Sequence, residues 1–587
     1  MKNRIIKSIS SLLLIVAVGC TNDYYLDKGP FTVIEEDAVF SDKNLTEANL
    51  LNLYDRTKFE ELGGQSDFNM GLIAAMGGSA RTVGAWQTPY AAALRVYDET
   101  GAGSMAYWPY NLIRDINSFI VGINNSELES EYILQRESEA RFLRAWAYFQ
   151  MVKRYGGVPI ITVPQQQDDP EEELYPARNT EKEVYDFIIE EAQAIAERLP
   201  SVYDGNDYGR VSKWAAIALV SRAGLYAGSI AKFGEENGPV GIPAGQANTY
   251  FQKSLDASKE IITKGPFSLY NRESDLSKNF ERLFVDENDN PEVILALRFD
   301  FEAQVGHSWD NLATPVGFTS AWSSNYPVYL NVLDLFDYAD GSSGAFDRTK
   351  FDGETLISKE ELFENRDPRF AASIFYPEIE WQGSNAYFHS STIYTDENGE
   401  RQESNSETFT IPGSDWRAKA PNKNQHRTGL LIKKRVDESY EPVASGQSSS
   451  DFLVFRYGEI LLNYAEAGFY LGTGDALDKL NQVRDRVGMP KRNELTEENI
   501  RQERQVELLF EEHRYWDLKR WRIADQVLNG RLKGMRYVYD FDAQKYLITE
   551  VNGDSGVRVF DPTKHYYFAL GVGRLADNPN LVENPGY

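Results

Sequence analysis

Cysteine is almost absent from this chain, since Cys20 is the only one among 587 residues. The rest of the sequence therefore has no disulfide framework and no thiolate metal site. Stability must come from a large core instead, and a hydrophobic content of 42% can supply one.

Positive charge is also scarce. The chain has 61 Lys and Arg against 89 Asp and Glu, which gives a formal net charge of −28. An acidic body of this kind repels the phosphates of nucleic acid and the anionic surface of a membrane. We therefore expect no nucleic-acid partner, and any membrane attachment must come from another feature of the chain.

The familiar catalytic and metal-binding motifs are missing. None of the five His residues pairs at i, i+4, and neither an HExxH motif nor a G-x-S-x-G elbow is present. Residues 286–290 begin like a calcium loop, but Pro291 replaces the needed Gly and Leu297 replaces the bidentate Glu. We predict a turn there and another at 472–474, with no catalytic residue, metal or cofactor.

The N-terminus has the layout of a secretory signal peptide. Residues 1–7 are positively charged, residues 12–18 are apolar, and Ala17-Val18-Gly19 leads directly to Cys20. This pattern predicts a lipoprotein signal peptide over 1–19, lipidation of Cys20 and a tether over 20–40. The alternative is an ordinary signal peptide with a chance cysteine. Acyl chains on Cys20 would hold the protein in membrane lipid outside the cytoplasm.

Hydrophobic periodicity indicates a mainly α-helical body over 41–587, without a linker-like run. We divide it into a helical part (41–265), a loop-rich part (266–450) and a C-terminal part (451–587) with helices and an irregular tail. A strand is expected at 293–299. Paired helices with small and aromatic positions suggest tetratricopeptide-like repeats. The spacing of apolar residues predicts helices from near Leu45 and at 108–123, 131–155, 180–198, 212–230, 249–263, 455–471, 475–487 and 497–528.

Several blocks in a fixed order carry a family resemblance, and they lie at 139–149, 155–159, 366–370, 455–467, 480–488, 503–521, 578–581 and 584–587. Together they resemble the SusD/RagB family of glycan-binding surface lipoproteins. One departure is the tail at 567–571, where the family often has a proline-containing strand.

The resemblance implies a SusD-like fold with four tetratricopeptide-like helix pairs and a loop-rich second half with short strands. It also implies a location in the outer membrane of a Gram-negative bacterium, facing outwards. The expected partner is a SusC-like TonB-dependent transporter, to which the lipoprotein delivers captured oligosaccharide or polysaccharide. Such a protein is not an enzyme.

Most charged residues in these blocks fall on predicted helices. Paired carboxylates there could act in catalysis, but we expect ion pairs between packed helices instead. The residues concerned are Arg141, Arg144, Glu459, Glu466, Arg484, Glu503, Arg504 and Glu507.

Sugars stack on aromatic rings while polar side chains bind their hydroxyls. Five tryptophans fall in helical segments and are expected in the core: Trp108, Trp146, Trp214, Trp516 and Trp521. The other five lie in loop-like sequence: Trp86, Trp309, Trp322, Trp381 and Trp416. In the family, the glycan platform uses an early loop and the segment after the third helix pair. The residues in comparable regions are Trp86, Trp309, Trp322 and Tyr326, with Asp67, Arg81, Asp310 and Asn325 as hydroxyl-binding candidates.

Each of these tryptophans has a second interpretation, as a buried anchor of its loop. Three other functions also stay open at this stage. The same architecture could bind another nutrient such as peptides, two carboxylates could act as a glycoside hydrolase pair, or the repeats could serve only as a protein scaffold.

Overall fold

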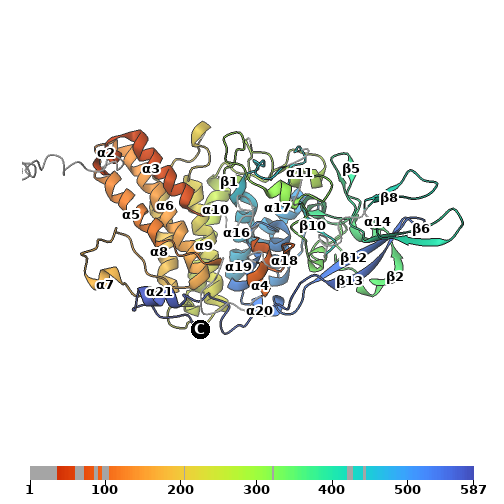
Figure 1. Ribbon diagram of the computed structural model, residues 1–587. Coiled ribbons are helices and arrows are strands. Elements are labelled where there is room, and N and C mark those ends of the chain that lie inside the picture. Colours follow the sequence, from red (N-terminus) through yellow and green to blue (C-terminus); the bar gives the residue numbers. More distant parts are fainter. Residues whose placement is uncertain are drawn as a thin grey trace, which may run out of the picture.

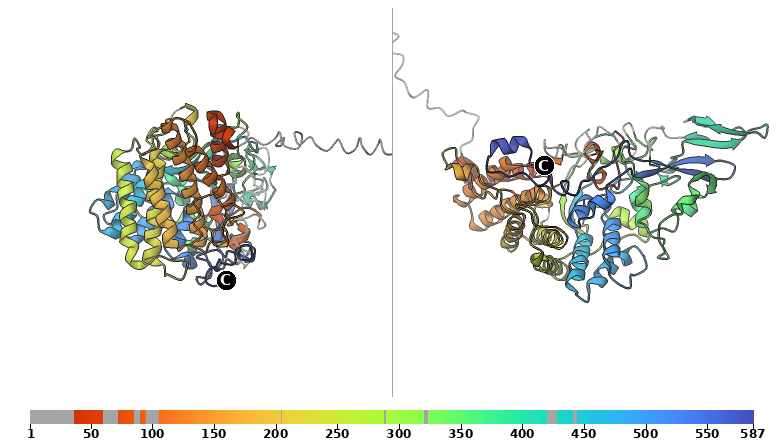
Figure 2. Two further views of the ribbon diagram at one scale, coloured as in Figure 1. Left: turned by 90° about the vertical axis from the view of Figure 1, so that its left-hand side faces the viewer. Right: turned by 90° about the horizontal axis from the view of Figure 1, so that it is seen from below.

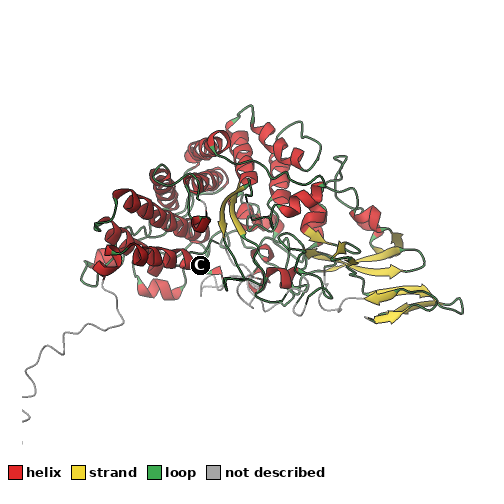
Figure 3. Ribbon diagram, turned by 90° about the horizontal axis from the view of Figure 1, so that it is seen from above, coloured by secondary structure: helices red, strands yellow, loops and turns green. Residues whose placement is uncertain are grey.

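The structure is a computed structural model, and it describes residues 36–59, 72–84, 90–94, 105–203, 205–287, 289–319, 323–406, 408–419, 428–440 and 444–587. Helices form an arc along one side of the molecule, and most strands gather at the end opposite α2 and α3 (Figures 1 and 3). The mainly α-helical fold is therefore confirmed.

The N-terminal part of the arc consists of helices that pack in sequence order, so that α3 contacts α5, α5 contacts α6, and the series continues through α8 and α9 to α10. Figure 2 shows these helices side by side. The bounds of these helices are α2 Glu36–Ser41, α3 Lys43–Arg56, α5 Tyr110–Asn124, α6 Ser130–Tyr155, α8 Glu181–Ala196, α9 Lys213–Phe233 and α10 Ala247–Lys264. Two short helices lie apart from this series, α4 Tyr90–Leu94 and α7 Glu171–Leu174.

Local chemistry sets these boundaries. Gly156 ends α6 with a φ of 70°, a conformation that glycine adopts without strain. Thr180 and Glu183 form a reciprocal capping box at the start of α8, and Ser212 caps α9. Helix α9 has the length and hydropathy of a membrane span, but its apolar window is completely buried inside the protein, as in a core helix.

The C-terminal helices continue the arc, with α16 contacting both α10 and α17. The single helix expected over 497–528 is wrong, because the chain forms three short helices there. Phe510 and Glu512 have φ values of 63° and 65°, which no α-helix accommodates. The bounds are α16 Tyr457–Leu471, α17 Ala476–Arg486, α18 Glu497–Glu507, α19 Arg514–Arg520, α20 Ala524–Val527 and α21 Val572–Asp577.

The strands form one larger sheet and several small ones. Strand β1 (Val293–Leu297) pairs with β11 (Phe452–Arg456), which joins the loop-rich part to the C-terminal part. The larger sheet has the order β2-β13-β12-β6-β7. Its strands are β2 Asp352–Ile357, β6 Ser391–Thr395, β7 Arg401–Ser404, β12 Lys533–Asp540 and β13 Lys545–Asn552. The tail is thus more regular than expected, since β12 and β13 have eight residues each.

Short elements complete the loop-rich part. Its helices are α11 Leu276–Arg282, α12 Trp309–Ala313, α13 Leu330–Leu333, α14 Lys359–Phe363 and α15 Arg369–Ser373. Its remaining strands are β3 Ile374–Phe375, β4 Glu380–Trp381, β5 Ser384–Asn385, β8 Thr408–Thr410, β9 Arg417–Lys419 and β10 Leu431–Ile432. The 3-10 helices are η2 Ile73–Ala75, η4 Gly205–Asp207, η5 Ala244–Gln246 and η6 Arg348–Lys350.

The charged residues of the helices form buried ion pairs, as expected. Although burial opposes it, Arg486, Arg456 and Arg369 hold the pKa of Glu507 well below its usual range. These pairs connect the helices to one another and to the 366–370 segment. They are Arg141–Glu191, Arg144–Glu191, Arg222–Glu459, Arg520–Glu466, Arg484–Glu503, Arg504–Asp517, Arg486–Glu507 and Arg369–Glu503.

Candidate functional site

Two segments far apart in the sequence meet, one before α4 and one within the loop-rich part. The Arg81 N–H donates to the Pro327 carbonyl at 2.8 Å, and the Val83 N–H donates to the Asn325 carbonyl at 3.1 Å. Ala80 and Val328 also form an antiparallel bridge. The structure therefore brings together residues 79–83 and 325–329, which belong to the two regions singled out from the sequence.

Trp309 and Tyr326 lie beneath this junction as buried side chains. Trp309 is 3% exposed, and its Nε1–H donates to the Lys434 carbonyl at 3.0 Å. Its ring lies 5.0 Å from the Tyr326 ring, and the Arg435 guanidinium lies 4.4 Å from its centroid. Neither ring offers an open face to a sugar in this conformation, so Trp309 acts as an anchor of its loop.

Asp310 is buried beside the same anchor. Its carboxylate accepts a hydrogen bond from the Asp437 N–H at 2.5 Å. Burial raises the pKa of Asp310 to about 6, which places its ionisation close to neutrality. A fully buried carboxyl group cannot reach a ligand at the surface without a rearrangement of the loop.

His307 connects the backbone at Trp309 to the distant segment that contains Ser450. Its Nε2 contacts the Ser450 carbonyl at 2.8 Å, and its Nδ1 accepts from the Trp309 N–H at 3.1 Å. Burial and the nearby Arg435 lower the pKa of His307 to about 3, so the ring is neutral at physiological pH. No sequence pattern indicated this role, because Ser450 lies 143 residues away in the chain.

Arg81 ties the early loop to the C-terminal tail. Its Nη1 donates to the Gly553 carbonyl, its Nη2 donates to Ser555 Oγ at 3.1 Å, and its guanidinium lies 4.4 Å from the Tyr90 ring centroid. Nearby, Asp554 and Arg558 form an ion pair of 2.9 Å. These tail residues were missed by sequence reasoning, which linked the platform only to the early loop and the segment after the third helix pair.

The remaining candidates divide between the buried framework and the chain outside the described residues. Asn325 is 6% exposed, and its Nδ2 contacts the Ser323 carbonyl at 3.4 Å. Asp67, Trp86, Trp322 and Cys20 lie outside the described residues. Of the other two loop tryptophans, Trp381 is buried in β4, and Trp416 packs against the rings of His389 and Tyr539.

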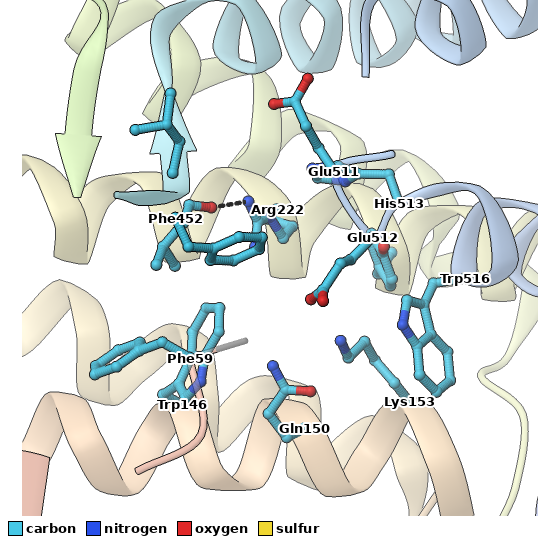
Figure 4. A pocket seen from close by; sticks show the side chains of 13 residues that line it. Phe59, Trp146, Gln150, Lys153, Arg222, Phe452, Glu511, Glu512, His513 and Trp516 are labelled. Carbon is cyan, nitrogen blue, oxygen red and sulfur yellow. Dashed lines mark hydrogen bonds between the residues drawn. The ribbon is translucent and has the colours of Figure 1, made fainter. Parts of the chain in front are cut away.

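A separate pocket lies inside the molecule, between α6, α9 and the residues that precede α19 (Figure 4). Trp146, Lys153 and Glu512 line it, and Arg222 donates to the Val454 carbonyl at its edge. Its volume of about 30 Å³ is room for about two water molecules and excludes a sugar ring. Within the described ranges, no cluster of three or more His, Cys, Asp or Glu side chains is placed to hold a metal ion.

Two family models match this chain. Residues 291–587 match the SusD family, and residues 77–225 match a family described as starch-binding and associating with the outer membrane. The first match alone covers half of the chain, and the two matches together include every described candidate residue.

Comparisons with individual proteins agree with these two matches. A SusD-like protein of Bacteroides ovatus is 24% identical over 554 residues, which cover 90% of this chain and 84% of that protein. A SusD-like protein from Bacteroides fragilis has a solved structure with a TM-score of 0.72 and 24% identity, covering 95% of this chain and 100% of that chain. A SusD-like carbohydrate-binding protein from the same species gives 0.68 and 23%, with coverages of 93% and 100%. The solved structures establish a shared fold.

Proposed function

The chain belongs to the SusD family, and on that premise we propose that it binds carbohydrate at the cell surface and passes it to an outer-membrane transporter. It acts as a binding protein and not as an enzyme. Two similarities support carbohydrate as the ligand. One relative of solved structure is described as carbohydrate-binding, and the family matched over 77–225 is described as starch-binding.

The observation that carries the proposal is the pairing of residues 79–83 with residues 325–329. Trp86 follows Val83 by three residues, and Trp322 precedes Asn325 by three residues. Trp309 and Arg435 pack together at this junction, and the Trp309 ring also packs against Tyr326 of the paired segment. We call these three residues the buried anchor. We propose that Trp86 and Trp322 provide the sugar-stacking surface.

Affinity electrophoresis of residues 21–587 through gels that contain neutral or acidic polysaccharides tests this function. We expect one polysaccharide to slow the protein, and either Trp86→Ala or Trp322→Ala to abolish that effect. Tyr175→Ala is the matched control, because Tyr175 is an exposed ring remote in sequence from the junction. Retardation by no polysaccharide would contradict the proposal, as would equal retardation of all variants.

The lipid anchor and the transporter are separate parts of the proposal. Cys20→Ala should move the protein from the membrane fraction to the soluble fraction and abolish incorporation of labelled palmitate. Cross-linking in intact cells should capture a TonB-dependent barrel with the native chain. A chain that stays in the membrane after Cys20→Ala would exclude acylation as its anchor.

A further inference from the structure

A wide cleft opens between the connection from α8 to α9 and the strand β1. Its volume is about 740 Å³, and described residues between 201 and 212 form one wall while described residues between 287 and 298 form the other. This volume lies within the range of about 300–1,000 Å³ that ligand pockets occupy. The residues of the buried anchor, Trp309, Tyr326 and Arg435, do not line this cleft. The cleft is therefore considered as a separate candidate site.

Three aromatic side chains border the cleft: Tyr203, Tyr208 and Phe267. All three are half-buried, in contrast to Trp309 and Tyr326. The Arg298 guanidinium lies 4.7 Å from the Tyr208 ring centroid. The Tyr203 hydroxyl is itself buried, so Tyr203 faces the cleft with its ring and not with its hydroxyl.

The charges around the cleft exclude an anionic ligand. Arg298 is neutralised by Asp451, with Nε to Oδ2 at 2.8 Å, and it lies 3.6 Å from Glu287. Asp289, an exposed carboxylate on the same wall, adds further negative charge. The other guanidinium, that of Arg210, is paired with three carboxylates: Asp207, Glu139 and Glu47.

Gly209 lets the two walls approach each other. Its φ is 98°, and a Cβ atom at this position would lie 2.9 Å from Arg298 Cγ. A side chain at 209 would therefore strain the backbone and displace Arg298 from Tyr208. The sequence thus uses a glycine where the cleft needs a close contact.

We propose that this cleft is a second carbohydrate-binding site, which takes a neutral oligosaccharide. Half-buried aromatic rings suit the C–H faces of sugars, and the carboxylates of Glu287 and Asp289 suit their hydroxyl groups. Burial and the nearby Asp451 raise the pKa of Glu287 to about 7, so at neutral pH this group both donates and accepts hydrogen bonds. The inference rests on the proposed function in one respect, the carbohydrate nature of the ligand.

Segment 448–451 connects the cleft to the Trp309 anchor. Asp451 pairs with Arg298 at the cleft, while the Ser450 carbonyl contacts His307, whose ring also accepts from the Trp309 N–H.

Hydrogen exchange measured by mass spectrometry tests the inference on the lipid-free chain, with maltohexaose, laminarihexaose, cellohexaose and xylohexaose as probes. We expect one of these oligosaccharides to slow exchange in residues 201–212 and 287–298. Tyr208→Ala should weaken that protection about two- to tenfold, as expected for the loss of one stacked ring. Tyr175→Ala, which removes an exposed ring elsewhere, should leave it unchanged.

The outcomes separate this inference from the proposed function. Protection confined to residues 79–84 and 323–328 would overturn the second site and support the platform. Absence of protection everywhere, together with no retardation in polysaccharide gels, would overturn both. Protection of 201–212 by tryptic peptides of casein, with none by the four sugars, would overturn the carbohydrate assignment of the cleft. The wild-type experiment decides the matter even where a variant fails to fold.

Discussion

The anchor at Trp309 and the cleft at Tyr208 differ in what covers their aromatic rings. Trp309 is 3% exposed, with Arg435 and Tyr326 packed against it, while Tyr208 has the Arg298 guanidinium against its ring and is half-buried beside an open cleft of about 740 Å³. Both residues lie in loop-like sequence. An aromatic residue in a loop is therefore not by itself a binding residue, because long-range packing decides whether its face is free.

Removal of each ring tests this difference in packing, and it gives the largest expected effect. Trp309→Ala should lower the free energy of unfolding by about 3–5 kcal/mol, because it empties a packed site and removes the hydrogen bond to the Lys434 carbonyl. Tyr208→Ala should lower it by about 1 kcal/mol or less, because its ring borders an open space. Guanidinium unfolding measures both, and equal losses would contradict the distinction.

The pH dependence of the anchor gives the next largest effect. The pKa of Asp310 is raised to about 6 in the folded protein, above its ordinary value, so the folded state binds more protons between about pH 4 and 6. Stability from this group is thus lost as the pH rises through that window. Asp310→Asn should increase the free energy of unfolding by about 2–3 kcal/mol at pH 8 and by almost nothing at pH 4.

Thermal unfolding of both proteins across pH 4–8 checks this prediction. A gain of the same size at both ends of the range would show that the amide acts through packing and not through ionisation. His307 lies in the same framework, but its lowered pKa affects stability in the opposite direction, as the pH falls below its ordinary value.

Two glycine substitutions test the role of Arg298 in the cleft. Gly209→Ala should lower the free energy of unfolding by about 1–3 kcal/mol and weaken binding of the protecting oligosaccharide, because it displaces Arg298. Gly399→Ala is the matched control, since Gly399 also has a positive φ, a Cβ atom added there would have no described atom within 4 Å, and it does not line the cleft. Denaturation and calorimetric titration measure the two effects, and equal binding by both variants would contradict a role for Arg298.

The smallest effect concerns Glu287 in the cleft. Its pKa is raised to about 7, so the folded state holds an extra proton between about pH 4.5 and 7 and loses stability as the pH rises through that range. Between pH 5 and 8, the Tm of Glu287→Gln should fall by about 1–2 °C less than the Tm of the wild-type protein. Differential scanning calorimetry at several pH values checks it, and parallel curves would exclude a perturbed Glu287.

Local sequence patterns predicted much of the helical scaffold. Apolar spacing identified α6, α8 and α9 to within a few residues, and the predicted turn at 472–474 begins where α16 ends. The family blocks indicated the fold and the ion-pair role of the charged helix positions. The break between α18 and α19 escaped this reasoning, because the apolar pattern continues while Phe510 and Glu512 adopt positive φ values.

The sequence by itself determined the helical periods, the acidic charge and the family, since each of these depends on residues close together in the chain or on an ordered set of motifs. Only the tertiary structure decided which loop aromatics are covered. Trp309 is buried by residues 434–435, Arg81 is held by residues 553–555, and the cleft is formed by two segments distant in the chain, 201–212 and 287–298. Burial depends on contacts between distant segments, and the spacing of residues along one segment does not predict those contacts.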